Sequence, residues 1–164
     1  MRVVIADTSP INYLILIDAI EVLRRLYRRV SIPAEVFAEL SAPGAPPAVA
    51  RWIAAPPGWL EVMPPADAQE PLLQHLDAGE AAAIRLALTH SDVLLLVDDA
   101  RGKAEAARRG IETAGTLAIL SDAAARNLIE LPPAVAKLLR TNFRIAQSIV
   151  AEYLAEDRRR REGY

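Results

Sequence analysis

Short apolar segments alternate along this chain with longer segments whose apolar residues have helical spacing, and this alternation constrains the fold more than any other feature. Strands separated by helices pair most readily in parallel, with the helices packed on both faces of the sheet. The sequence therefore predicts an α/β fold, a three-layer α/β/α sandwich with a short, mainly parallel five-stranded sheet. The predicted strands are residues 2–6, 30–32, 59–63, 93–97 and 111–113.

Capping residues, prolines and glycines set the expected helix bounds. We expect a helix with Ser9 as its N-cap and Pro10 as its first residue, running to about residue 29 with a break near Asp18. Gly110 is expected to end a helix at 100–109. Residues 1–164 are predicted to form one domain, with an all-helical C-terminal part at about 115–160. The other predicted helices are 34–41, 47–55, a short helix after Pro64-Pro65, 77–89, 115–127, 133–140 and 145–160.

The composition excludes several kinds of protein. The chain has 164 residues, no cysteine and a formal net charge of −2, which excludes disulfides and thiolate zinc sites and argues against a simple basic coat for nucleic acid. No apolar run approaches the ~18 residues of a membrane-spanning helix, so we expect no membrane association. The lack of cysteine favours a cytoplasmic location. Dinucleotide, phosphate-loop and serine-hydrolase motifs are missing from the sequence.

Acidic residues directly follow two of the predicted strands. Asp7 comes after the strand at 2–6, and Asp98-Asp99 come after the strand at 93–97. Because the ends of parallel strands converge at one edge of the sheet, where ligands bind, these side chains predict a pocket of carboxylates. A divalent metal ion is the simplest partner that would hold such a pocket together.

Two glutamates are further candidates for this pocket. Glu39 lies on the helix that follows Pro33, and Glu80 lies at the start of the helix predicted at 77–89. Asp77 and Glu80 also have the spacing of a reciprocal N-terminal cap. Each acid at this edge therefore has a second, structural interpretation as a turn former, a helix cap or an exposed helix residue. The residue pattern alone leaves both interpretations open.

Five motifs occur in order between residue 2 and about residue 150. They are IADTSPINYL at 5–14, VSIPAEVFAEL at 30–40, LDAGEAAAI at 76–84, LLVDDAR at 95–101, and GI at 110–111 followed by GTL at 115–117. In this order and spacing the sequence resembles the PIN domain family, and more narrowly the VapC-like branch of prokaryotic PIN nucleases. Each motif is weak by itself, and the specificity of the resemblance comes from the set.

The resemblance implies a metal-dependent ribonuclease that hydrolyses RNA phosphodiester bonds with Mg²⁺ or Mn²⁺. Ser9 and Asn12 are implied as supporting polar groups that bind the substrate. Arg101 and Lys103, just beyond the last acids, are predicted to contact flanking phosphates, the alternative being a solvated helix face. The implied catalytic and metal-binding residues are Asp7, Glu39, Glu80, Asp98 and Asp99.

The resemblance also implies partners. The branch often acts as the toxin of a toxin–antitoxin pair, so a small antitoxin protein and a homodimer are expected besides the RNA substrate. One alternative is a catalytically inactive PIN-fold module that binds RNA or a protein partner, supported by the alanines at 81–83. A more distant alternative is a phosphotransferase with Asp7 as nucleophile, although Ser9 stands where such enzymes usually have a second Asp.

Overall fold

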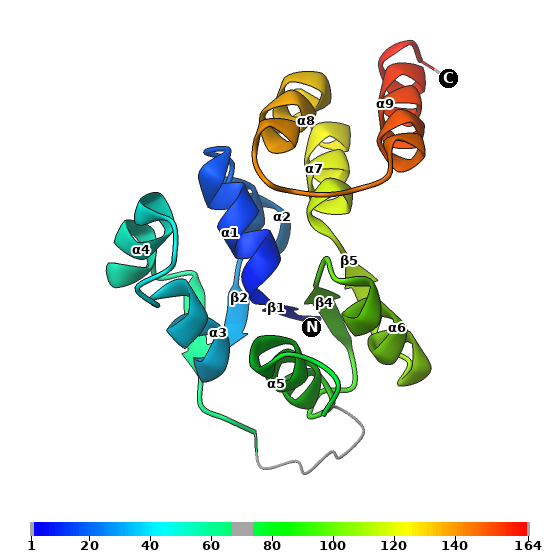
Figure 1. Cartoon of the computed structure of the whole chain (residues 1–164). Helices are drawn as coiled ribbons and strands as arrows, with labels where there is room; N and C mark the ends of the chain where they lie inside the picture. The colour runs from blue at the N-terminus through cyan, green and yellow to red at the C-terminus, as the bar shows by residue number, and fades with distance from the viewer. Residues whose placement is uncertain (1, 67–73, 164) are drawn as a thin grey trace.

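Five parallel strands form one sheet in the computed structural model, which describes residues 2–66 and 74–163 (Figure 1). The strand order is β3-β2-β1-β4-β5, so β1 lies at the centre between β2 and β4. The predicted α/β/α fold is thereby confirmed. The strands are β1 (Val3–Ala6), β2 (Val30–Pro33), β3 (Leu60–Met63), β4 (Val93–Leu96) and β5 (Glu112–Ala114).

The central strands are apolar on both faces because the sheet separates two hydrophobic cores. Successive side chains of a strand point to opposite faces. In β1, Val4 and Ala6 belong to the larger core, whereas Ile5 belongs to the smaller core on the other face. In β4, Leu94 and Leu95 are divided in the same way. This arrangement explains why the two strands are continuous apolar runs rather than alternating ones.

Helices cover both faces of the sheet. Helices α5 (Ala78–Ala87) and α6 (Ala100–Arg108) pack on the smaller core, on the opposite side of the sheet from α1 and α7 (Figure 1). Helix α3 (Ala34–Leu40) contributes Val36 and Leu40 to the larger core and also contacts α5. The other helices of the larger core are α1 (Thr8–Leu16), α2 (Glu21–Tyr27), α4 (Pro47–Ala54), α7 (Thr116–Ala125), α8 (Leu131–Arg140) and α9 (Gln147–Arg161).

The predicted start of the first helix was wrong. The helix begins at Thr8, and Asp7 rather than Ser9 occupies the N-cap position, with extended backbone angles (φ −79°, ψ 173°). The backbone N–H of Asp7 still donates to the Leu96 carbonyl at 2.9 Å. Asp7 therefore both continues the pairing of β1 with β4 and caps the helix. Pro10 is the third helical residue. The helix tolerates a proline there because the N–H groups of its first turn have no partners within the helix.

Two other predicted boundaries agree with the structure, whereas α8 begins at Leu131 rather than 133 and α9 at Gln147 rather than 145. The expected break near Asp18 is confirmed, since Asp18 has a positive φ of 59° and separates α1 from α2. Gly110 follows the C-cap of α6 and turns the chain away from the helix, as predicted. Its φ of 72° is a conformation that glycine adopts at little cost. Three helices beyond residue 115 form the predicted all-helical C-terminal part. The short helix predicted after Pro64-Pro65 falls largely on residues 67–73, outside the described residues.

No helix within the described ranges has both the length and the apolar character needed to cross a membrane.

Candidate metal centre

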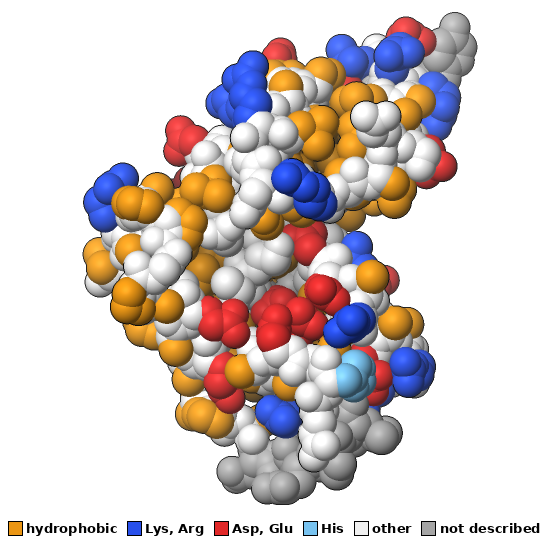
Figure 2. Space-filling model, viewed as in Figure 1, with side chains coloured by type: hydrophobic (Ala, Val, Ile, Leu, Met, Phe, Trp, Pro, Cys, Tyr) orange, Lys and Arg blue, Asp and Glu red, His pale blue; other side chains and the backbone are white. Residues whose placement is uncertain are grey.

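The acids at the carboxyl ends of β1 and β4 line a cavity of about 670 Å³. Figure 2 shows acidic side chains gathered in a hollow in the middle of one face of the molecule. Carboxylates from four separate parts of the chain meet there, as the convergence of parallel strand ends predicted. The lining residues are Asp7, Thr8, Ser9, Asn12, Tyr13, Glu39, Asp77, Glu80, Asp98, Asp99, Ala100, Asn142, Phe143 and Arg144.

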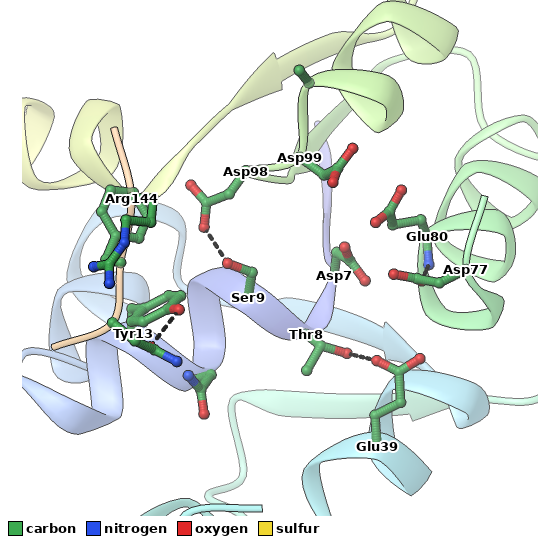
Figure 3. Close-up of a pocket in the computed structure, with 14 residues that line it drawn as sticks. Asp7, Thr8, Ser9, Tyr13, Glu39, Asp77, Glu80, Asp98, Asp99 and Arg144 are labelled. Atoms are coloured by element: carbon green, nitrogen blue, oxygen red, sulfur yellow. Dashed lines mark hydrogen bonds between the residues drawn. The ribbon is translucent and has the colours of Figure 1, made fainter. Parts of the chain in front are cut away.

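Three of these carboxylates form a compact group. One oxygen each from Asp7, Glu39 and Asp77 lies within 4.8 Å of the other two, so a single cation would contact all three. The three residues come from the end of β1, from α3 and from the position before α5. Glu39 is oriented by the hydroxyl of Thr8, which donates a hydrogen bond to Glu39 Oε2 (Figure 3). The group has the oxygen donors that hard divalent ions prefer.

Asp7 lies in an environment that disfavours its negative charge. Only 5% of the residue is exposed, and its Oδ1 atom is buried without a hydrogen-bond donor among the described residues. Burial is the main cause that raises the pKa of Asp7, to about 7, and the nearby carboxylates of Asp77 and Glu39 add to the rise. The backbone of Thr8 acts in the opposite direction. A buried, unpartnered carboxylate oxygen fits a bound cation, which would supply the missing favourable interaction.

Asp77 has a role that the sequence reasoning missed. Its predicted place as N-cap is confirmed, because Asp77 Oδ1 accepts a hydrogen bond of 2.8 Å from the Glu80 backbone N–H, which is one half of the reciprocal cap. The same carboxylate also belongs to the three-membered group around Asp7. Its position in the sequence could have indicated this role. A residue that caps a helix starting at the acidic edge of the sheet also lies near the other acids.

Glu80 lies beside Asp77 and Asp99 in the cavity rather than in the compact group (Figure 3). Burial, the hydrogen bond with Asp77 and the charges of Asp77, Asp99 and Asp7 raise the pKa of Glu80 to about 8. Glu80 packs beside Gly102 of α6, where a Cβ atom would lie 3.4 Å from Glu80 Oε2, in ordinary van der Waals contact.

The two adjacent acids after β4 differ in their contacts. Asp99 caps α6 by accepting from the backbone N–H groups of Arg101 and Gly102. Asp98 accepts from the Ser9 hydroxyl at 2.6 Å, and from the hydroxyl and backbone N–H of Thr116, both at 2.7 Å. One acid thus caps a helix while the other ties β4 to α1 and α7, and both line the cavity.

The predicted substrate-binding residues fall into two groups. Ser9 and Asn12 line the cavity, and the Ser9 hydroxyl is engaged with Asp98. Arg101 is exposed on α6 and Lys103 is half-buried there, and neither belongs to the residues that line the cavity. Contact between RNA and any of these four residues stays a prediction.

Several residues of the site carried little signal in the sequence. Thr8 and Thr116 lie inside the motifs, yet their hydrogen bonds to Glu39 and Asp98 depend on how distant elements pack. The segment at 142–144 lies about 130 residues beyond α1 along the chain, and nothing in its sequence indicated that it lines the cavity. The cavity residues that the sequence did not assign to the site are Thr8, Tyr13, Asp77, Ala100, Asn142, Phe143 and Arg144.

A comparison with protein families agrees with this geometry. A family model described as a PIN domain matches residues 3–158, nearly the whole chain. This chain belongs to the PIN domain family. The PIN domain is a nuclease-type fold whose members commonly use divalent metal ions, and the acidic group of this PIN domain is compatible with such an ion. A comparison with curated proteins found no match.

Proposed function

We propose that this PIN domain is a metal-dependent ribonuclease that hydrolyses RNA phosphodiester bonds. The observation that carries the proposal is the compact group of Asp7, Glu39 and Asp77, whose oxygens lie within 4.8 Å of one another. Such a group is costly without a cation, first because Asp7 is buried with no donor to its Oδ1 atom among the described residues, and second because like charges repel. A group of carboxylates held close together at the ends of strands is typical of a metal centre.

The donors of this group favour Mg²⁺ or Mn²⁺, because all are carboxylate oxygens and no described nitrogen or sulfur ligand joins them. When bound, such an ion lowers the pKa of a coordinated water and stabilises negative charge on a phosphate. Asp7, Glu39 and Asp77 are the residues that would hold it. Thr8 keeps the Glu39 carboxylate turned toward Asp7, which limits the reorganisation that binding requires.

The remaining polar groups have roles in the proposed hydrolysis. The oxygen of a water molecule joins the phosphorus and the bond from phosphorus to O3′ breaks, which leaves a 5′-phosphate and a 3′-hydroxyl. Glu80 and Asp99 line the cavity beside the metal group. Asp99 would orient that water and take up its proton, and Glu80, whose pKa is raised to about 8, would deliver a proton to the leaving O3′. Asp98, fixed by Ser9 and Thr116, keeps the end of β4 against the end of β1.

The finer assignments are predictions that rest on the motifs. We propose that the chain belongs to the VapC-like branch, acts in the cytoplasm as the toxin of a toxin–antitoxin pair and forms a homodimer. A small antitoxin with a basic side chain would fit the cavity, because the lining residues include six acids and one base. Such a side chain would relieve the same repulsion as a metal ion. Sedimentation of the purified chain, alone and co-expressed with the protein encoded by the adjacent gene, would measure homodimer formation and antitoxin binding.

The structure bears on the alternative of an inactive module. Its sequence support was the run of alanines at 81–83, read as the loss of an acid. All three alanines are at most 5% exposed, and Ala81 and Ala83 pack in the smaller core. An acidic residue at position 81 or 83 would therefore enter an apolar environment. The acids of this region are Asp77, the N-cap of α5, and Glu80 in its first turn.

Cleavage assays with matched variants test the proposal. Fluorescently labelled structured and single-stranded RNA would be incubated with Mg²⁺, Mn²⁺ or EDTA and with the variants Asp7→Asn, Glu39→Gln and Asp77→Asn. We expect cleavage to require metal and to fall more than about 100-fold in the first two variants, because even outer partners of a metal commonly contribute about 10- to 100-fold. Glu61→Gln, an exposed acid on β3 outside the cavity, is the control and should behave as the wild type.

Two outcomes would contradict the proposal. Equal cleavage by the wild type and Asp7→Asn would indicate a contaminating nuclease. Metal binding without cleavage of any RNA would favour the inactive module instead.

A further inference from the structure

The wall of the cavity opposite the acids comes from the connection between α8 and α9. Asn142, Phe143 and Arg144 line the cavity there together with Tyr13 of α1, and these four residues are called the Arg144 wall (Figure 3). A basic side chain lies over this connection, across the hollow from the acidic patch, in Figure 2. The all-helical C-terminal part of the chain therefore completes the site rather than only extending the core.

The Arg144 wall is held in place by several contacts. The Tyr13 hydroxyl donates a 2.7 Å hydrogen bond to Asn142 Oδ1, and the Tyr13 ring packs edge-on against Phe143 with centroids 5.0 Å apart. Phe143 is 7% exposed and belongs to the larger core. Its backbone N–H donates to the Thr141 hydroxyl, which in turn donates to the Leu138 carbonyl at the end of α8. The backbone that carries Arg144 is thus fixed next to the cavity.

Arg144 is the single basic residue among the described residues that line the cavity, against six acids. Its side chain is exposed, and no ion pair within 4.0 Å joins it to an acid in the described ranges. Burial and the charge of Asp98 raise the pKa of the Tyr13 hydroxyl, and the positive charge of Arg144 offsets part of this rise. A guanidinium that lines a cavity without an ion-pair partner is well suited to bind an anion such as a phosphate.

We infer that Arg144 binds a backbone phosphate of the RNA strand next to the bond that is cleaved, and that Tyr13 positions it. The inference rests on the proposed function, which makes the substrate a polyanion. That strand must approach six carboxylates, and a cation in the metal group compensates the repulsion at one phosphate only. Arg144 supplies a second favourable contact on the other side of the cavity. An RNA strand that reaches from the acidic group to the Arg144 wall therefore binds best.

Binding measurements without turnover test this inference. Fluorescence anisotropy of a labelled ten-nucleotide single-stranded RNA would be recorded in EDTA and in Ca²⁺ for the wild type, Arg144→Ala and Arg140→Ala. Arg140 is the matched control because it is exposed at the end of α8, four residues away, and does not line the cavity. We expect Arg144→Ala to weaken binding about 10-fold, as for one lost charged hydrogen bond, with Arg140→Ala unchanged within about twofold.

Salt dependence and a second variant make the test specific. One lost phosphate contact should reduce the slope of log K against log salt by about 0.7 for a single strand. Tyr13→Phe keeps the ring against Phe143 and removes only the bond to Asn142, so it should weaken binding by a smaller factor with the salt slope unchanged. Circular dichroism and thermal melting would confirm that each variant is folded.

The outcomes separate the inference from the proposed function. Arg144-dependent binding without any RNA cleavage would support the phosphate site and count against the nuclease. Metal-dependent cleavage with equal RNA binding by Arg144→Ala and Arg140→Ala would overturn the inference and leave the nuclease intact. Tighter Mg²⁺ binding by Arg144→Ala, with RNA binding unchanged, would show that Arg144 only neutralises the acids of its own chain, and would overturn the inference. A wild type that binds no RNA would overturn it as well.

Discussion

Gly79 lies so close to the carboxylate of Glu39 that a Cβ atom at position 79 would come within 2.5 Å of Glu39 Oε1. This approach brings α3 against the first turn of α5, and it allows Glu39 to join Asp7 and Asp77 in one group. A missing side chain on one helix thus creates room for a carboxylate from another. The observed position of the Glu39 carboxylate therefore requires a residue without a side chain at position 79.

Gly79→Ala is therefore expected to displace Glu39 and weaken metal binding at least about 10-fold. Global stability should change little, because alanine improves helix propensity by up to about 1 kcal/mol and offsets part of the clash. Isothermal titration calorimetry with Mn²⁺ and urea unfolding would measure the two effects. Gly44→Ala is the control, since no atom lies within 4 Å of a Cβ atom there. Unchanged Mn²⁺ affinity in Gly79→Ala would show that Glu39 is not a ligand.

Asp77→Asn separates the two roles of Asp77. Asparagine caps helices about as well as aspartate, so the metal-free stability should fall by less than about 1 kcal/mol. The loss of a charged ligand should nevertheless weaken Mn²⁺ binding by more than about 10-fold. Asp99→Asn makes the same change at the cap of α6, outside the compact group, and should affect Mn²⁺ less. Equal Mn²⁺ affinities in the two variants would contradict the assignment of Asp77.

The metal-free protein is expected to lose stability as pH rises from about 5 to 8. The folded pKa values of Asp7, about 7, and Glu80, about 8, exceed the value of about 4 in an unfolded chain. Between these values the folded protein binds more protons than the unfolded chain, so the free energy of unfolding falls with rising pH. For Asp7 the full shift corresponds to at most about 4 kcal/mol.

Urea unfolding in EDTA at several pH values would measure this slope. Asp7→Asn should flatten it and be more stable than the wild type at pH 8. Saturating Mg²⁺ should stabilise the wild type most at pH 8, where both carboxylates must ionise, and should not stabilise Asp7→Asn. Stability that rises between pH 5 and 8 in EDTA would falsify the unfavourable burial and repulsion of these carboxylates, on which the proposed metal site rests.

Thr116→Val removes one of the three donors that hold Asp98. The variant keeps the shape of the side chain and the backbone N–H, so it should cost about 1–2 kcal/mol of unfolding free energy, as for a lost bond to a charged group. Chemical unfolding would measure the loss. Thr113→Val, the same change on β5 outside the cavity, should be nearly neutral. Equal stabilities of both variants would show that Asp98 does not depend on the hydroxyl of Thr116.

The sequence alone determined the strands, the α/β class and the acids that follow β1 and β4. Buried strands are runs of apolar residues bounded by polar ones, and this pattern is local. The Asp77–Glu80 cap was also readable, because both partners lie within one turn. The error at Ser9, predicted as N-cap, arose because Asp7 is both the residue that follows β1 and the N-cap of α1.

Tertiary structure alone decided which acids meet. Asp77 joins Asp7 and Glu39 only because α5 packs against α3 at Gly79, and a sequence does not reveal a distance between helices. Arg144 faces the acids because Phe143, far along the chain, inserts into the same core as α1. Local patterns specify which residues stand at the end of an element. Packing of side chains between distant elements decides what each of them faces.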